Sequence, residues 1–223
     1  MVALSKSDWR LFLCLVALGL IGTWVPLFDL DEGAFLEATR EMLDGGHWAS
    51  TTLDGEPRYD KPILSYWLQA ISLTLFGWLS PAIPTEIIGR LPSVVAGALW
   101  AVVLGHFSEE VTKKPGLGVF VALAVATTLG TSIISRAATA DAILNLWLDL
   151  LFTDIARYIL NPSDSLRLKI FLWLGLGILT KGPVAAIIPA CAFGFWVLLS
   201  NQWSLFWNAI KSWGGWALMM TLL

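Results

Sequence analysis

Apolar stretches close to the length of a membrane-spanning helix recur along this chain, and they constrain its fold more than any other feature. They cover residues 11–28, 88–107, 117–134, 142–160, 168–180 and 184–199. A helix needs about 20 apolar residues to cross the hydrocarbon core of a bilayer. With 57% hydrophobic and 14% charged residues, the chain is also more apolar than a soluble domain requires. We therefore predict an all-α, polytopic bundle of membrane helices.

The positions of the basic residues predict which ends of these helices face the cytoplasm. Lys6 and Arg10 precede the first apolar stretch, which reads as an uncleaved signal anchor with a cytoplasmic N-terminus. Three further inside loops are marked by Lys113 with Lys114, by Arg167 with Lys169, and by Lys211. This count places residues 29–61, 136–141 and 181–183 at the outer face of the membrane. The net charge of −3 gives no indication of nucleic-acid binding.

That count depends on residues 62–77, which are short for a span. The polar residues Ser65, Gln69 and Ser72 recur there at helical spacing, which favours a helix that lies on the outer surface. The alternative is a full crossing, which would place Asp141 and Lys181 on the opposite face from Asp31. With the surface reading, the chain has about seven spans. The last, 213–223, has about half the necessary length, so we expect a longer protein to complete it.

The outer loop contains a second amphipathic helix with its own start and stop signals. Phe35, Ala38 and Met42 form an apolar face, opposite carboxylates that include Glu37. Asp29 or Asp31 can cap its start, and Gly45-Gly46 ends it. Residues 53–56 read as a tight turn. We thus predict two surface-lying helices after the first span.

Acidic residues gather in this outer loop, beginning with Asp31 and Glu32 directly after the first span. A carboxylate at this position can act as a general base on an acceptor hydroxyl or amine, or bind a divalent ion. Helix capping with a solvated acidic face is the alternative. No metal site is predicted firmly; Asp31 and Glu32 would be its ligands if a divalent cation is used.

Two lysines precede prolines that are predicted to open helices. In Asp60-Lys61-Pro62, the proline takes the first helical position and Asp60 can cap it. Lys181-Gly182-Pro183 repeats the arrangement on the same predicted face. A lysine beside a helix N-terminus favours an anion, so the pair predicts a phosphate or pyrophosphate site. The alternative is that both lysines anchor helix ends among lipid headgroups.

Arg136 and Asp141 lie at the outer end of another span, within Ser-Arg-Ala-Ala-Thr-Ala-Asp. A charged residue close to the hydrocarbon tends to be paired or functional. Both readings stay open here, because a local Arg–Asp ion pair would pin the helix end equally well.

The ordered set of motifs resembles bacterial membrane glycosyltransferases related to protein O-mannosyltransferases, including the aminoarabinose transferases of lipid A. The motifs are Asp31-Glu32, Ala38-Thr39-Arg40-Glu41-Met42-Leu43, Gly46-His47-Trp48, Leu53-Asp54-Gly55-Glu56-Pro57, Tyr59-Asp60-Lys61-Pro62-Ile63-Leu64, Tyr66-Trp67-Leu68, Arg136-Ala137-Ala138-Thr139-Ala140-Asp141 and Leu179-Thr180-Lys181-Gly182-Pro183. The resemblance implies the C-type glycosyltransferase fold in a bacterial inner membrane. Residues 1–223 would be its N-terminal transmembrane catalytic module, with an outer active-site loop at 29–87 and the C-terminal remainder absent.

The resemblance also implies the chemistry. The donor would be a polyprenyl-phosphate-linked sugar, and the acceptor a lipid, glycan or protein at the outer face. Asp31 matches the proposed catalytic base, Asp141 the second functional acid, and Lys61 the contact to the donor phosphate. Further substrate-binding candidates are Glu32, Arg58, Asp60, Arg136 and Lys181. No cofactor is required, because lysines can neutralise the phosphate.

One departure from the pattern bears on the substrates. Lipid A enzymes typically carry Arg-Tyr where this chain has Ala34-Phe35, so the sugar and the acceptor stay open. The rival functions are a non-catalytic lipid-phosphate-binding or transport protein, with ionisable residues near the bilayer midplane, and an inactive truncated fragment. The gathering of charges at one face favours surface chemistry.

Overall fold

The computed structural model describes residues 5–223 except 28, 80 and 81, and within that part it is helical apart from one β-hairpin. The chain divides into two compact units, Met1–Leu146 and Trp147–Leu223, which are described separately. The predicted all-α class is therefore confirmed. The number of spans stays a prediction. Among the described helices, α4 alone is both long and apolar enough to cross a membrane by length and composition.

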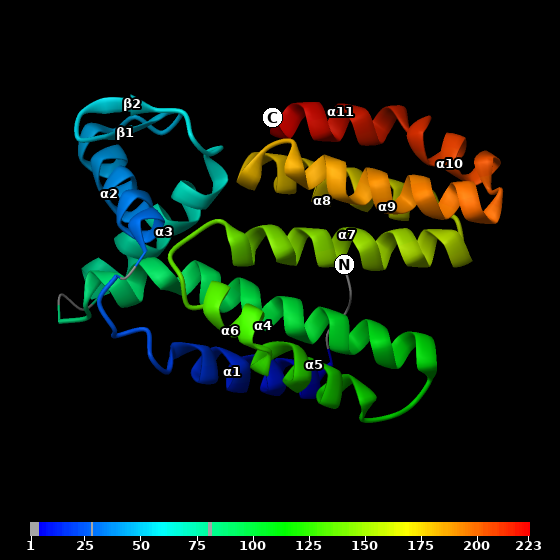
Figure 1. Ribbon diagram of the computed structural model, residues 1–223, viewed down its shortest axis with the longest axis horizontal. Helices are drawn as coiled ribbons and strands as arrows, with labels where there is room; N and C mark the ends of the chain where they lie inside the picture. Colours follow the sequence, from blue (N-terminus) through cyan, green and yellow to red (C-terminus); the bar gives the residue numbers. More distant parts are fainter. Residues whose placement is uncertain (1–4, 28, 80–81) are drawn as a thin grey trace. The chain divides into compact units, whose positions relative to one another are not determined.

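The first unit is built around α4 (Figure 1). Its elements are α1 (Lys6–Leu20), α2 (Leu30–Gly45), β1 (Thr51–Leu53), β2 (Glu56–Arg58), α3 (Leu64–Leu79), α4 (Thr85–Thr112), α5 (Leu117–Thr127), α6 (Leu129–Ile134) and the first turns of α7 (Asp141–Leu160). Helices α1 and α5 pack along α4, while α2, α3 and the hairpin gather near its N-terminal end.

Small residues allow α4 and α5 to approach closely. A Cβ atom added at Gly105 of α4 would lie 2.4 Å from the carbonyl oxygen of Gly118 in α5, so the two backbones touch there. Such close approach is typical of helix pairs in membranes, where packing rather than hydrophobic burial drives association. The interface is completed by a small apolar cluster that includes Val102 and Ala122.

The predicted continuous span 117–134 is wrong, because the structure divides it into α5 and α6. Thr128 has extended backbone angles, φ −63° and ψ 144°. The hydroxyls of Thr127 and Thr128 donate to the carbonyl oxygens of Leu123 and Val125, at 2.7 and 2.9 Å. Side-chain bonds of this kind compete with the helical ladder, and here they coincide with the break.

The structure contains both the helix and the turn predicted for residues 29–56. Helix α2 is confirmed: Asp29 caps it by accepting from the Asp31 N–H at 3.1 Å, and Gly46 ends it with φ 69°. The predicted turn is also confirmed, because Asp54 and Gly55 have φ of 54° and 77° in a β1–β2 hairpin of the type I′ kind.

Helix α3 begins later than predicted. Its first helical residue is Leu64, so Pro62 lies two residues before the helix and not at its first position. The polar stripe also faces a different way than the surface reading assumed. Ser65, Gln69 and Ser72 are buried against the protein, whereas Ile71 and Leu75 are exposed. Polar residues at helical spacing here mark a packed face. The surface-lying position of α3 stays a prediction.

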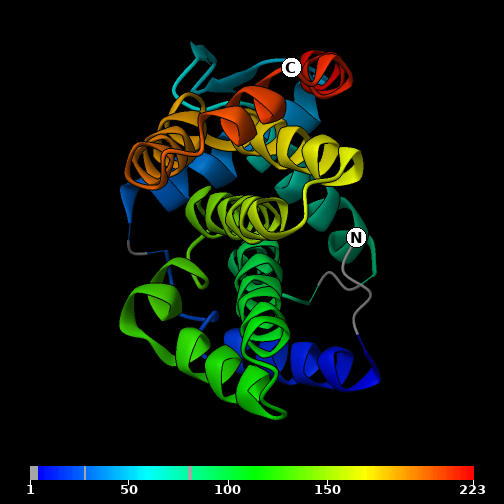
Figure 2. The same ribbon diagram turned by 90° about the vertical axis from the view of Figure 1, so that its right-hand side faces the viewer.

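The second unit consists of the rest of α7 and four further helices. These are α8 (Asp164–Lys181), α9 (Val184–Ser200), α10 (Trp203–Ile210) and α11 (Trp213–Leu222). Helix α8 packs on α9 and α11 (Figures 1 and 2), with Gly215 of α11 placed directly against the Phe171 ring of α8.

The contact between α4 and α5 generates a stability prediction. Gly105→Ala should destabilise the protein by about 1–3 kcal/mol, because the new methyl group meets backbone atoms that cannot rotate away. Gly130→Ala in α6 is the matched control. Nothing lies within 4 Å of its added Cβ, so it should stabilise the helix by about 0.5–1 kcal/mol. Unfolding in mixed detergent micelles measures both, and equal effects would contradict the packing described.

Candidate functional site

The start of α2 places two adjacent carboxylates in opposite environments. Asp31 is exposed, and Glu32 is fully buried. Because the Asp29 side chain supplies the helix cap, the capping alternative for Asp31 is not needed to explain the helix start. The exposed carboxylate of Asp31 therefore lies at the surface beside a buried partner that fixes the backbone behind it.

Glu32 forms a bidentate ion pair with Arg90 of α4. Arg90 Nε donates to Glu32 Oε1 and Arg90 Nη2 donates to Glu32 Oε2, both at 2.9 Å. The side chain of Arg90 is 1% exposed and that of Glu32 is 0% exposed. The same guanidinium donates through Nη1 to the carbonyl oxygens of Thr23 and Val25, at 2.8 and 2.6 Å. One buried cation thus joins the segment after α1, the start of α2 and α4.

The segment between α6 and α7 is held by side chains from three helices. The Ala138 N–H donates to Glu32 Oε1 at 2.7 Å, and Gln69 Nε2 of α3 donates to the Ala138 carbonyl at 3.0 Å. Ser93 Oγ of α4 donates to the Thr139 carbonyl at 3.2 Å. This segment leads directly into Asp141, the first residue of α7. The hydrogen bond from the Ala138 N–H to Glu32 therefore connects the segment that carries Asp31 with the segment that carries Asp141.

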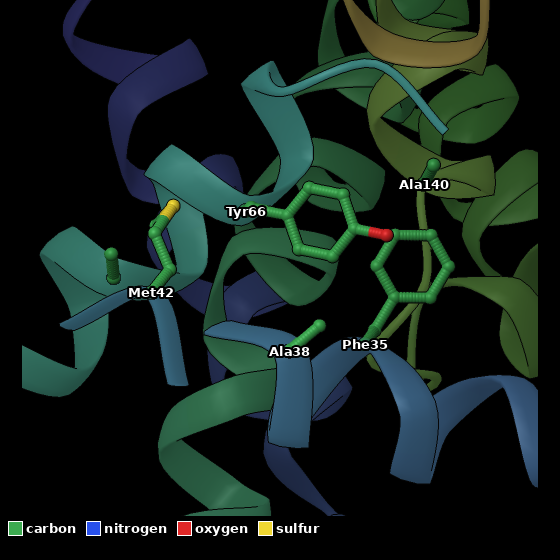
Figure 3. Close-up of a cluster of buried hydrophobic side chains, with 6 residues drawn as sticks. Phe35, Ala38, Met42, Tyr66 and Ala140 are labelled. Atoms are coloured by element: carbon green, nitrogen blue, oxygen red, sulfur yellow. The ribbon is translucent and has the colours of Figure 1, made fainter. Parts of the chain in front are cut away.

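An apolar cluster joins α2 and α3 (Figure 3). Phe35 and Tyr66 stack with ring centroids 5.0 Å apart and 24° between planes, and both are almost completely buried. Ala140, the neighbour of Asp141, belongs to the same cluster. The buried hydroxyl of Tyr66 has no hydrogen-bond partner in the structure. Thr39 Oγ1, which donates to Gln69 Oε1 at 2.8 Å, adds a polar link between the same helices.

The segment before α3 carries a cluster of charges centred on Asp60. Lys61 Nζ lies 3.0 Å from both carboxylate oxygens, and Arg58 Nη2 lies 3.0 Å from Oδ2. Hydrogen bonds from Lys61, followed by the charges of Lys61 and Arg58, hold the pKa of Asp60 below its ordinary value. Two cations and one carboxylate leave the cluster positive at neutral pH. Arg58 Nε is buried there without a hydrogen-bond partner.

Arg136 has a different environment from the one expected. Its Nε and Nη2 donate to the carbonyl oxygens of Ile21 and Leu18, at 2.9 and 3.0 Å, and Nη1 donates to Ser132 at 2.9 Å. The guanidinium thus binds carbonyl groups in the last turn of α1 and directly after it. Asp141 accepts from Thr139 Oγ1 at 3.4 Å.

Lys181 lies in the second unit, and its local setting corrects the prediction. It is the last residue of α8, Gly182 is the C-cap with φ 73°, and α9 begins only at Val184. Lys181 therefore ends one helix and does not open the next.

A metal site does not fit the described residues. No three His, Cys, Asp or Glu side chains within the described part of the chain come together as a ligand set. Both oxygens of Glu32 already accept hydrogen bonds, from Arg90 and from the Ala138 N–H. A cation held by Asp31 and Glu32 together would have to displace them.

Sequence reasoning missed Arg90 and Gln69, which organise the site. A signal for Arg90 was present, because it is a single cation inside the apolar stretch 88–107, and such residues are usually paired. Gln69 was noticed but assigned to a water-facing stripe. Neither partner could be identified, since Glu32 and Arg90 lie 58 residues apart in the chain.

The buried pair yields a direct comparison with an exposed pair on the same helix. Glu32→Gln should cost about 3–5 kcal/mol of unfolding free energy, because it leaves the Arg90 charge buried and uncompensated. Glu37→Gln removes the partner of Arg40, whose side chain is 60% exposed, and should cost less than about 1 kcal/mol. Unfolding in mixed micelles measures the free energy of unfolding of both variants. Equal losses would show that the buried pair contributes no more stability than the exposed pair.

Comparisons with known proteins agree with this architecture. The dolichyl-phosphate-mannose-protein mannosyltransferase family model matches residues 60–223. An undecaprenyl phosphate-alpha-4-amino-4-deoxy-L-arabinose arabinosyl transferase of Shewanella sediminis is 28% identical over 96% of this chain and 37% of the relative. The enzyme of the same name from Aeromonas hydrophila is 30% identical over 79% of this chain and 32% of the relative.

Solved structures give the same result for the fold. The crystal structure of ArnT from Cupriavidus metallidurans bound to undecaprenyl phosphate matches with a TM-score of 0.81 at 21% identity, over 98% of this chain and 40% of that chain. The chain spans about two-fifths of the length of such relatives. These findings confirm the resemblance drawn from the motifs. Since the family model covers well over half of the sequence, the chain belongs to the dolichyl-phosphate-mannose-protein mannosyltransferase family of multi-pass membrane proteins.

Proposed function

We propose that this chain carries the catalytic loop of a glycosyltransferase that moves a sugar from a polyprenyl-phosphate donor to a lipid, glycan or protein acceptor. The reaction takes place at the outer face of a bacterial inner membrane, with the N-terminus in the cytoplasm. The observation that carries the proposal is the positive cluster of Arg58, Asp60 and Lys61, in which the side chains of Arg58 and Lys61 are partly exposed. A cluster with a net positive charge and two guanidinium or ammonium donors is suited to a phosphate.

The donor phosphate binds at this cluster in the proposal. Lys61 is 23% exposed and Arg58 15% exposed, so both cations are partly desolvated but reachable. As the bond between the anomeric carbon and the phosphate oxygen breaks, negative charge builds on that oxygen. Lys61 and Arg58 stabilise this charge, and Asp60 holds the two cations in place. Lys181 is proposed separately as a substrate-binding residue of the second unit.

Asp31 acts on the acceptor. Its exposed carboxylate accepts the proton from an acceptor hydroxyl or amine while the oxygen or nitrogen forms the new bond to the anomeric carbon. The phosphate leaves with the bonding electron pair, so charge and atoms balance. Asp141 assists by orienting the acceptor. Glu32 is the neighbour of Asp31 and binds the Ala138 N–H, so it fixes the backbone near both Asp31 and Asp141. Arg136 supports the site through the carbonyl oxygens at the end of α1.

An open hollow lies along the start of α2, the helix that carries Asp31. Ala34 lines this hollow of about 450 Å³, together with the acidic residues Asp29, Glu37 and Asp54. An anionic group would be repelled there, whereas an uncharged or cationic one would not. The lack of an arginine at position 34 thus favours an acceptor without phosphate groups at this point.

Donor binding tests the cluster, with undecaprenyl phosphate as the probe. Lys61→Ala should weaken binding about 10- to 100-fold, the range for a charge-assisted contact. Lys114→Ala, in a loop predicted to face the cytoplasm, is the matched control and should bind like the unaltered protein. Native mass spectrometry in detergent measures all three. Equal affinities for Lys61→Ala and Lys114→Ala would refute the phosphate site.

Asp31→Asn separates catalysis from binding. It should leave undecaprenyl phosphate binding unchanged and abolish consumption of polyprenyl-phosphate-linked sugar in membranes that contain the complete polypeptide. Retained transfer would refute the base assignment. Loss of phosphate binding by Lys61→Ala combined with no sugar transfer by the unaltered protein would favour the non-catalytic lipid-phosphate-binding reading.

A further inference from the structure

Two neighbouring hollows in the second unit differ in the polarity of their walls. The first, which we call the apolar hollow, has a volume of about 360 Å³ and lies among α7, α8, α9, α10 and α11. Its walls are aliphatic and aromatic, and they include Phe171, Phe193, Phe206 and Trp216. The second, which we call the polar hollow, has a volume of about 310 Å³. It is lined by Tyr158, Pro162, Ser163, Asp164, Arg167 and Asn208.

The two hollows adjoin each other. Tyr158 of α7 lines both of them. On α8, Arg167 lines the polar hollow, and Phe171 and Leu174, four and seven residues later, line the apolar hollow. Residues at this spacing share one face of a helix, so the same face of α8 passes from one hollow to the other. Together the hollows form one site with a polar end and an apolar end.

The polar end contains one cation and one carboxylate. Arg167 Nη1 donates to the Asn208 carbonyl at 3.0 Å, and Arg167 Nη2 forms an ion pair with Asp164. The Arg167 side chain is 26% exposed and the Asp164 side chain is 85% exposed, so both remain accessible to a ligand. The two charges balance, and a ligand that carries both signs complements them better than a net anion does.

Tyr158 supplies a further hydrogen-bonding group where the hollows meet. The residue is 2% exposed, and within the described part of the chain its hydroxyl has no hydrogen-bond partner. A buried tyrosine hydroxyl usually finds a partner. Because Tyr158 lines both hollows, a ligand that occupies the site can supply that partner.

The surroundings of the polar hollow have the character of a membrane–water interface. Trp203 and Trp207 of α10, the helix that contributes Asn208, are exposed. Tryptophan favours the level of the lipid headgroups. Arg167 and Lys211 belong to loops that are predicted to face the cytoplasm. A lipid of the inner leaflet would thus have its headgroup at the polar hollow and its hydrocarbon chain at the apolar hollow.

We infer that this site binds a glycerophospholipid whose headgroup carries both a phosphate and an ammonium group, as in phosphatidylethanolamine. One acyl chain fills the apolar hollow. The phosphate accepts hydrogen bonds from Arg167 and Tyr158, and the ammonium group donates to Asp164. A protein segment could cover the apolar hollow but would not account for the balanced charges beside it. The site uses no residue of the outer loop, so the inference is independent of the proposed sugar transfer.

The headgroup is tested with phosphatidylethanolamine and phosphatidylglycerol of identical acyl chains, by native mass spectrometry of the protein in detergent. The unaltered protein should bind phosphatidylethanolamine more tightly. Arg167→Ala should weaken binding of both lipids about 10- to 100-fold, because it removes a charge-assisted contact to the phosphate. Asp164→Asn should weaken phosphatidylethanolamine binding about two- to fivefold, the range for an exposed ion pair, without weakening phosphatidylglycerol binding.

Lys211→Ala is the matched control for charge. Lys211 is an exposed cation on the same predicted face, and it lines neither hollow. Its removal should leave phosphatidylethanolamine binding unchanged. Equal effects of Arg167→Ala and Lys211→Ala would overturn the inference, because they would indicate general attraction of lipid phosphates to this face. Tighter binding of phosphatidylglycerol by the unaltered protein would also overturn it.

The acyl chain is tested by filling the apolar hollow, which avoids the risk that Arg167→Ala disturbs the fold. Gly194 of α9 lines this hollow, and nothing lies within 4 Å of an added Cβ. Gly194→Leu should therefore fold and weaken phosphatidylethanolamine binding about tenfold or more, because methylene groups of the lipid can no longer be buried there. Gly130→Leu in α6, which has equal space around its Cβ and lines neither hollow, should bind normally.

Two results of this last comparison would contradict the lipid assignment. Unchanged phosphatidylethanolamine binding by Gly194→Leu would show that no acyl chain enters the apolar hollow. Weaker binding of undecaprenyl phosphate by Gly194→Leu, with phosphatidylethanolamine binding unchanged, would assign the hollow to a polyprenyl chain instead.

Discussion

The buried pair between Arg90 and Glu32 is the interaction on which the outer region of this protein depends. A guanidinium and a carboxylate that are both removed from solvent are tolerated only when all their hydrogen-bonding capacity is used in good geometry. That requirement is met here by bringing the segment after α1, the start of α2 and the Ala138 N–H to the same place. Asp31 and Asp141 extend from two of these segments. The positions of these two acids are thus a consequence of satisfying the buried charges.

Much of the local structure of this region could be predicted from the sequence. The cap at Asp29, the stop at Gly46 and the Asp54-Gly55 turn are all local signals, because each depends on backbone angles or hydrogen bonds within a few residues. The helical class followed from the recurring apolar stretches. The motifs then identified the family, which the match over residues 60–223 confirmed.

What could not be predicted depends on contacts between distant segments. A period of polar residues shows that a helix has two faces but not what covers them, so the stripe with Gln69 was assigned to water although it binds Thr39 and Ala138. Arg136 and Lys181 were predicted as substrate-binding residues, Lys181 because the Lys181-Gly182-Pro183 motif indicated a helix start. The structure shows Arg136 bound to carbonyl groups of α1 and Lys181 at the end of a helix. In an apolar environment a polar residue usually meets protein partners before it meets a substrate.

Hydrogen exchange at the segment between α6 and α7 tests the central claim most directly. Arg90→Lys keeps the charge but loses the planar fork that binds Glu32 at two points. Exchange followed by mass spectrometry should then show amides of residues 135–140, which include Ala138, exchanging about tenfold faster or more, as expected for the loss of a charge-assisted bond. The hairpin at 51–58 should be unaffected. Unchanged protection of residues 135–140 in Arg90→Lys would show that the buried pair does not hold the site together.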